Sequence, residues 1–265
     1  RWEDGWPIER IENHSWYAHA NHSLSTAPAE NATHSMTYKP SIGLEGGGPT
    51  MWWGSILPDQ QPMDDYSLVY DSEILDTPLE ILGRPIARLR VSANATRANW
   101  VVRVSDVAPD GQVTQVAGAA FNGTHRISAR EPSDIVLGEE FDLNIDLHFT
   151  SWVFPKGHRV RVAISNAQWP MLWPTPMQMK STLAIGGNNG ARIDLPVVPP
   201  GEKNAPNFKE PSPNPWLSGY EVIDYGNITG YAAINSIQHD PETGEAFGVA
   251  TNTGAVRYPW GIERF

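Results

Sequence analysis

One stretch of the chain alternates strictly between apolar and polar side chains over nine residues. Its apolar members are Phe141, Leu143, Ile145, Leu147 and Phe149, and its polar members are Asp142, Asn144, Asp146 and His148. Successive side chains of a β-strand point to opposite faces, so this pattern predicts a half-buried strand over residues 141–149. All five apolar side chains are expected to face a core. The same period of two predicts further strands over residues 87–91, 100–105 and 160–164, although the second of these is apolar on both faces.

Turn residues separate these stretches. A Pro-Asp-Gly sequence at residues 109–111, a Pro-Lys-Gly sequence at 155–157 and a glycine-rich segment at 186–190 are typical of tight reversals. Gly and Pro number 23 each among 265 residues, which excludes long continuous helices over most of the chain. We therefore predict an all-β fold, a jelly-roll-like antiparallel sandwich of the galactose-binding-domain-like kind.

The chain divides unevenly. Residues 8–200 are expected to form the sandwich, with an irregular N-terminal lead of loops and short strands before residue 72. Residues 201–265 are expected to form a Pro-rich crossover followed by a β-rich extension of short strands, with a hairpin turn over 240–244. A strand predicted over residues 256–265 reaches the last residue with no turn after it, which suggests a truncated extension.

Composition argues against several partners. The formal net charge is −11, with 19 basic and 30 acidic residues, which disfavours nucleic acids and anionic membrane surfaces. No apolar run approaches the 18 residues of a membrane span, and the first residues lack a signal-peptide pattern. Cysteine is absent, so neither a disulfide nor a thiolate nucleophile is available. A soluble protein of the bacterial cytoplasm is the expected setting.

Catalytic motifs are missing from the sequence. There is no G-x-S-x-G elbow, no phosphate-binding glycine loop and no H-E-x-x-H metal motif. Four histidines gather in the first region (His14, His19, His22 and His34), and we interpret them as polar loop residues rather than metal ligands. We expect no catalytic residue, no metal site and no cofactor in this chain.

Several longer segments resemble one known domain. The segments are Asp59–Pro62, Ser67–Leu75, Pro78–Pro85, Val153–Val162 and Ile164–Pro170. Together they resemble the C-terminal β-sandwich of the X-Pro dipeptidyl-peptidase and cocaine-esterase (CocE/NonD) family of serine hydrolases. The resemblance spans residues 8–200, and it departs from the family pattern at Trp173–Met179, where many relatives have an Asn-rich loop.

The resemblance implies that the catalytic residues lie on a different domain from this one. Proteins of this family carry Ser, Asp and His on an α/β-hydrolase domain, with a helical cap and this sandwich beside it. The partner implied for this chain is that missing N-terminal α/β-hydrolase domain, with homo-oligomerisation as a further expectation. The parent protein is then a serine hydrolase, and this chain alone is expected to be inactive. The competing function is a carbohydrate-binding jelly-roll module, and a third is a purely structural interface domain.

Three adjacent residues are candidates for substrate contact. Met51, Trp52 and Trp53 occupy the position at which the resemblance implies a loop directed at the acyl pocket of the neighbouring domain. Two adjacent Trp side chains on a strand face opposite ways, so at most one of them meets a ligand while the other packs. The alternative is that all three fill the core or a domain interface.

Two other groups have both a structural and a functional interpretation. Gly157, His158 and Arg159 enter a strand, and we expect a structural turn rather than a catalytic base beside an anion clamp. Trp169 and Trp173 could form a stacking platform for sugars, or they pack within their loop or contact another domain. An exposed aromatic row with polar neighbours would favour sugar binding, whereas an apolar patch beside residues 51–53 would favour the hydrolase interpretation.

Overall fold

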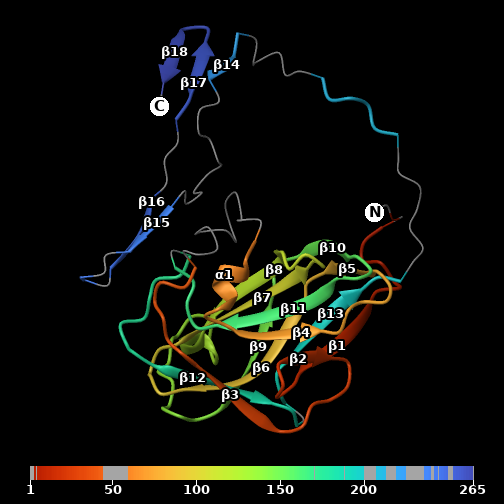
Figure 1. Ribbon diagram of the computed structural model, residues 1–265, viewed down its shortest axis with the longest axis vertical. Coiled ribbons are helices and arrows are strands. Elements are labelled where there is room, and N and C mark those ends of the chain that lie inside the picture. Colours follow the sequence, from red (N-terminus) through yellow and green to blue (C-terminus); the bar gives the residue numbers. More distant parts are fainter. Residues whose placement is uncertain are drawn as a thin grey trace.

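The computed structural model describes residues 3, 5–43, 59–169, 171–187, 189–199, 207–212, 219–224, 236–239, 242–243, 245–249 and 253–264. Thirteen strands form the main sheet (Figure 1). They are β1 (Glu12–Ala18), β2 (Ser23–Ser25), β3 (Ala32–Thr37), β4 (Leu68–Ser72), β5 (Leu79–Gly83), β6 (Ile86–Ala93), β7 (Asn99–Val107), β8 (Val113–Asn122), β9 (Phe141–Asp146), β10 (Thr150–Phe154), β11 (Arg159–Ser165), β12 (Lys180–Ile185) and β13 (Arg192–Val197). Among the described residues the helices are short: α1 (Gln61–Asp64) and a 3₁₀ turn over Gly123–His125.

The main sheet folds over into two layers. Its strand order is β3-β12-β6-β13-β1-β2-β4-β11-β7-β8, with β9 paired to β6 and β5 paired to β10 and β13. The short strand β2 joins the layers, because it pairs antiparallel with β1 and parallel with β4 through Ser23 opposite Asp71. All other pairings among the described strands of this sheet are antiparallel. The predicted all-β sandwich is therefore confirmed.

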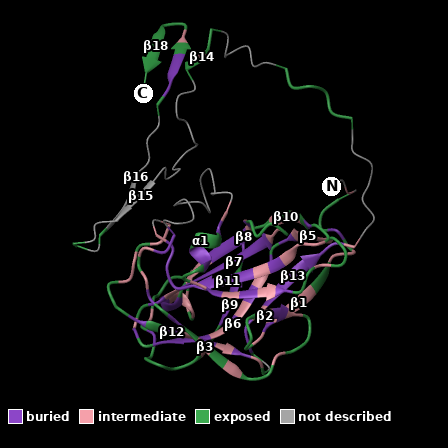
Figure 2. Ribbon diagram, viewed as in Figure 1, coloured by how far each residue is buried: buried purple, intermediate pink, exposed green. Residues whose placement is uncertain are grey.

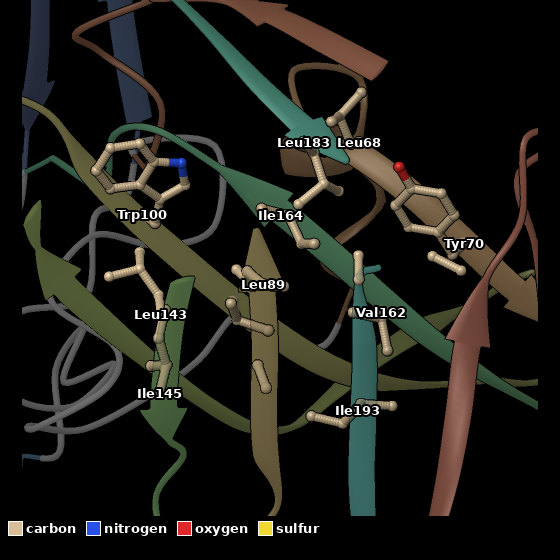
Figure 3. Packing of buried hydrophobic residues seen from close by; sticks show 14 of the residues in the cluster. Leu68, Tyr70, Leu89, Trp100, Leu143, Ile145, Val162, Ile164, Leu183 and Ile193 are labelled. Carbon is tan, nitrogen blue, oxygen red and sulfur yellow. The ribbon is translucent and has the colours of Figure 1, made fainter. Parts of the chain in front are cut away.

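The core lies between the two layers. Leu89 of β6 and Ile193 of β13 belong to the same buried cluster as Val162 and Ile164 of β11 (Figure 3). Trp100 of β7 is fully buried and meets the half-buried ring of Phe141 edge to face, with ring centroids 5.4 Å apart. Most residues of β6, β7 and β11 are buried, whereas many residues of the connecting loops are exposed (Figure 2).

The alternating stretch at residues 141–149 forms a shorter strand than predicted. Leu143, Ile145 and Leu147 are buried as expected, but β9 ends at Asp146 and Phe149 is 51% exposed. The pairing with β6 stops because β6 begins at Ile86, opposite Asp146. The chain then crosses to β10, which pairs with β5 instead. Phe149 lies in that crossing, so its place in the alternation does not bring it into the core.

Strand β7 is buried on both faces. Trp100, Val102 and Val104 point into the core, whereas Val101 and Arg103 point to the opposite face and are also buried. Figure 1 shows α1 beside β7 and β8 on this side of the sheet. The second apolar face predicted for this strand is thus explained by a covering segment that includes α1.

The C-terminal extension forms two small sheets of its own. Strands β14 (Glu221–Asp224), β17 (Ala255–Tyr258) and β18 (Gly261–Arg264) form one, and β15 (Ser236–His239) and β16 (Ala246–Val249) form the other. The antiparallel β15–β16 pair confirms the hairpin predicted around residues 240–244. The single strand predicted over residues 256–265 is instead a hairpin, with Tyr258 opposite Gly261. Pro259 explains the break, because proline has no N–H to offer a sheet.

Candidate functional site

A buried set of charges fastens α1 to the outer face of β7 and β11. Arg103 of β7 is fully buried and donates from Nη2 to Asp64 Oδ1 at 2.8 Å. Arg161 of β11 donates from Nη1 to the other oxygen of Asp64 at 2.9 Å. Arg161 also forms a bidentate pair with Asp71 of β4, in which both bonds are 2.7 Å long. Asp64 therefore bridges two guanidinium groups, and the four charges cancel.

The neighbours of Arg103 make room for its side chain. The residues opposite it on β11 and β8 are Ala163 and Gly118, so neither strand places a large side chain beside the guanidinium. Burial lowers the pKa of Arg103, and the nearby Asp64 carboxylate opposes that shift. The bidentate hydrogen bonds to Asp71 raise the pKa of Arg161. Both groups stay charged at neutral pH, since arginine is effectively always protonated.

This face also holds polar atoms without partners. Among the described residues, no hydrogen bond reaches Nε or Nη1 of Arg103 or the hydroxyl of Ser105, and all three atoms are buried. An unpaired buried donor costs about 1–3 kcal/mol, and more when it is charged. The ion pairs with Asp64 thus stabilise the sheet face under α1, whereas the three buried polar atoms without hydrogen bonds destabilise it.

The candidate substrate residues Met51, Trp52 and Trp53 lie outside the described residues. The structure does describe what flanks them. On the N-terminal side, Ile42 is fully buried and its carbonyl accepts from the backbone N–H of Trp169 at 2.6 Å. On the C-terminal side, Gln60 N–H donates to the Val113 carbonyl at 2.8 Å. Asp59 Oδ1 accepts from the Val113 N–H at 3.2 Å. Both flanks of residues 44–58 are therefore anchored to the sandwich.

The Gly157–His158–Arg159 turn connects three parts of the sandwich. Gly157 has φ +89°, a conformation that favours glycine, and its N–H donates to the Leu75 carbonyl at 2.9 Å. His158 Nδ1 lies 2.8 Å from Asp106 Oδ1. Arg159 Nη1 donates to the Ser72 carbonyl at 2.6 Å. Within the described chain, no hydroxyl nucleophile contacts His158. The geometry suits a turn held by hydrogen bonds.

The structure brings together two of the histidines at residues 14–34. His22 and His34 stack with ring centroids 4.4 Å apart, and both rings lie parallel to the buried ring of Tyr70. His34 Nε2 faces the Ala20 carbonyl at 3.2 Å and Nδ1 faces the Tyr70 hydroxyl at 2.8 Å. A carbonyl can only accept, so Nε2 carries the proton and Nδ1 accepts from Tyr70. His34 belongs to β3 and packs against the sandwich, and is not a loop residue as predicted.

No described group of residues forms a metal site or an activated nucleophile. No cluster of three His, Cys, Asp or Glu residues with metal-binding geometry occurs among the residues the structure covers. Ser25 Oγ lies 2.9 Å from His19 Nε2, which places a serine hydroxyl beside a histidine. The same Nε2 atom faces the Ala27 carbonyl at 3.1 Å, which favours its protonated tautomer and so removes the base. In the part of the chain that is described, no helix is long and apolar enough to cross a membrane.

Trp169 and Trp173 lie together at the loop between β11 and β12. Their ring centroids are 5.4 Å apart at an interplanar angle of 73°, and Trp173 is 81% exposed. Trp173 borders an open pocket of about 590 Å³. Of the two rings considered from the sequence as a stacking platform, Trp173 is exposed and Trp169 is partly buried against it.

The sequence analysis did not identify Arg103 and Asp64. A signal for Arg103 was present, since it is the charged residue in the middle of a strand that is apolar on both faces. Arginine in such a strand indicates a buried ion pair. No comparable signal marks Asp64, because its four-residue helix is too short to show a helical period.

Relatives with known names match parts of this chain. A cocaine esterase from Rhodococcus sp. (strain MB1 Bresler) is 34% identical over 114 residues, which is 42% of this chain and 20% of that protein. A Mycobacterium bovis protein with the provisional name serine esterase is 26% identical over 232 residues, which is 76% of this chain and 36% of that protein. The chain thus spans about a fifth to just over a third of the curated relatives it matches.

Solved structures share the fold. An aminopeptidase from a marine sediment archaeon (Thaumarchaeota archaeon) superposes with a TM-score of 0.64 at 21% identity, covering 74% of this chain and 38% of that one. An α-amino acid ester hydrolase superposes with a TM-score of 0.62 at 22% identity, covering 70% of this chain and 36% of that one. The sandwich is therefore an architecture that also occurs as part of larger proteins.

One family model matches most of the chain. Residues 1–191 match the X-Pro dipeptidyl-peptidase C-terminal non-catalytic domain. This range includes almost all of the sandwich described above, up to the residue before β13. The chain belongs to the family of X-Pro dipeptidyl-peptidase C-terminal non-catalytic domains.

Proposed function

We propose that this chain serves as the non-catalytic C-terminal domain of a serine hydrolase, of the X-Pro dipeptidyl-peptidase-like or ester-hydrolase type. Its role is to cover an α/β-hydrolase domain of the same protein and to help wall the acyl pocket of that domain. The observation that carries the proposal is the match of residues 1–191 to a domain family that is non-catalytic and C-terminal. The esterases among the relatives are about three to five times longer than the part that matches, which leaves room for a catalytic domain.

The anchoring of the residues on either side of 44–58 supports the pocket role. Ile42 and Gln60 fix the two flanks of this segment by backbone hydrogen bonds, and Asp64 fastens the helix that follows it with two ion pairs. A wall that positions a substrate must itself be held in place. Met51, Trp52 and Trp53 would supply the apolar surface between these anchors.

In the proposed mechanism the chemistry takes place on the partner domain. A serine there attacks the carbonyl, a histidine moves the proton, and backbone donors stabilise the oxyanion. The contribution of this chain is to position the acyl group, and a misplaced substrate can lose about 100-fold in rate. We also propose that the Gly157–Arg159 turn is structural, which is supported by its contacts with Leu75, Asp106 and Ser72.

The test uses the full-length parent hydrolase. Trp52→Ala and Trp53→Ala are compared with the parent for one substrate with a bulky acyl group and one acetyl ester. A pocket wall predicts that kcat/KM falls more for the bulky substrate, because a small acyl group does not reach the wall. Trp260→Ala serves as control, since Trp260 is 82% exposed on the C-terminal extension. An unchanged ratio between the two substrates would refute the pocket role and reduce these residues to interface packing.

Carbohydrate binding is the second candidate function. The specific observation in its favour is the exposed ring of Trp173 beside a pocket with polar side chains.

A further inference from the structure

The loop that carries Trp173 is held from several sides. Trp169 packs against the Trp173 ring in a T-shaped arrangement, and Trp173 nevertheless stays 81% exposed. The Thr175 carbonyl accepts from the Tyr38 hydroxyl at 3.2 Å, and Thr175 Oγ1 donates to the Arg97 carbonyl at 3.3 Å. The exposed ring is therefore presented by a braced loop, which lowers the entropy that a ligand would have to remove.

A set of polar residues forms a wall of the pocket of about 590 Å³ that Trp173 also lines. Its side chains belong to Arg97, Asn99, Asn122, His125 and Asp134. Asn122 Oδ1 already accepts from the backbone N–H and the hydroxyl of Thr124, which leaves its amide nitrogen as a donor. The Trp173 pocket, defined by these five residues and Trp173, thus combines one aromatic face with both donors and acceptors.

Backbone hydrogen bonds fix this wall. Ser133 N–H donates to the Thr124 carbonyl at 2.8 Å, and Ile135 N–H donates to the Thr96 carbonyl at 2.9 Å. Arg126 Nη2 donates to the Asp134 carbonyl at 2.9 Å, so the backbone beside the Asp134 carboxylate is held in place. Pockets that bind small molecules are usually largely preformed in this way.

The chemistry of the Trp173 pocket suits a neutral sugar. One face of a pyranose ring carries C–H groups that pack on an aromatic face, while its hydroxyls both donate and accept hydrogen bonds. Arg97 and Asp134 carry opposite charges, so the pocket has no net charge from these two groups to attract an anion or a cation. A purely apolar ligand would leave the amide, guanidinium and carboxylate groups without hydrogen bonds.

We propose that the Trp173 pocket binds a neutral saccharide, with a pyranose ring stacked on Trp173 and its hydroxyls bonded to Asn99, Asn122 and Asp134. This inference rests on the second candidate function, carbohydrate binding, and is separate from the role proposed for residues 51–53. If no saccharide binds, the proposed role in covering a hydrolase domain still stands, because the two proposals rest on different residues.

The test titrates the chain with cellobiose, lactose and maltose. Binding is followed by tryptophan fluorescence and by saturation-transfer NMR, up to the solubility limit of each sugar. Trp173→Ala should weaken binding about three- to tenfold, the size expected for loss of an aromatic stacking partner. Asp134→Asn, which keeps the shape of the side chain and removes its charge, should also weaken binding. Trp260→Ala removes an indole of equal exposure outside the pocket and should leave binding unchanged.

Each result decides the proposal. Saturation transfer to a disaccharide that is lost in Trp173→Ala and kept in Trp260→Ala supports it. The proposal is overturned if none of the three sugars binds the unmodified chain, or if Trp173→Ala binds as well as Trp260→Ala does. Circular dichroism of each variant checks folding, and Asp134→Asn provides a second variant should Trp173→Ala misfold.

Discussion

The replacement Asp64→Asn removes the one carboxylate that contacts Arg103 among the residues that the structure describes. Arg103 is fully buried on β7, and its other described partner is the Ser67 hydroxyl at 3.2 Å. The replacement would therefore leave a buried guanidinium without a counterion. Breaking a buried ion pair from one side costs about 3–5 kcal/mol, and we expect a loss of this size in the free energy of unfolding.

A matched control comes from the other carboxylate of the same network. Asp71 accepts two hydrogen bonds from Arg161, but its side chain is 32% exposed and Arg161 is also paired with Asp64. Water can replace part of the lost interaction, so Asp71→Asn should cost about 1 kcal/mol or less. The difference between the two variants isolates the effect of burying an unpaired charge, because both replacements are Asp to Asn.

The assay is urea unfolding at pH 7, followed by far-ultraviolet circular dichroism. The double variant Asp64→Leu with Arg103→Met replaces the pair by apolar groups, and it should lose less stability than Asp64→Asn alone. The reasoning is refuted if Asp64→Asn costs no more than Asp71→Asn. It also fails if the double variant is the least stable of the three.

Three further predictions concern the core, the histidines and reactivity. Leu143→Ala and Ile145→Ala should each cost about 2–5 kcal/mol, and Phe149→Ala less than about 1 kcal/mol, in the same urea assay; equal losses would contradict the burial difference. Burial and the neighbouring His22 lower the pKa of His34 below its ordinary value of 6.5. The unfolded chain thus binds a proton at His34 more readily than the folded chain does. The contribution of His34 to the free energy of unfolding is therefore fully present above pH 6.5 and is lost as the pH falls below it. Urea unfolding measured across this pH range should show a smaller loss of stability for His34→Gln than for the unmodified chain. A fluorophosphonate probe should label no serine of this chain, and stoichiometric labelling would show an activated nucleophile.

The alternation of apolar and polar residues predicted burial correctly where the direction of each side chain depends only on the strand itself. The alternation around Leu143 and Ile145 predicted a core strand because side-chain direction follows directly from the backbone period. Its end was predicted wrongly, since β9 stops where its partner β6 begins at Ile86. The length of a strand depends on a neighbour that is distant in sequence, and the alternation up to Phe149 carries no information about that neighbour.

The amino-acid sequence by itself determined the fold class, the turns and the family. Each depends on short segments, such as the Pro109–Gly111 turn or the motifs around Pro155, whose conformation follows from local chemistry. Tertiary structure decided the rest. Asp64 reaches Arg161 across 97 positions, and His34 reaches Tyr70 across 36. The first contact forms only when α1 packs on β11, and the second only when β3 comes close to β4. The energy of an ion pair or a ring stack depends on distance in space and not on separation along the chain.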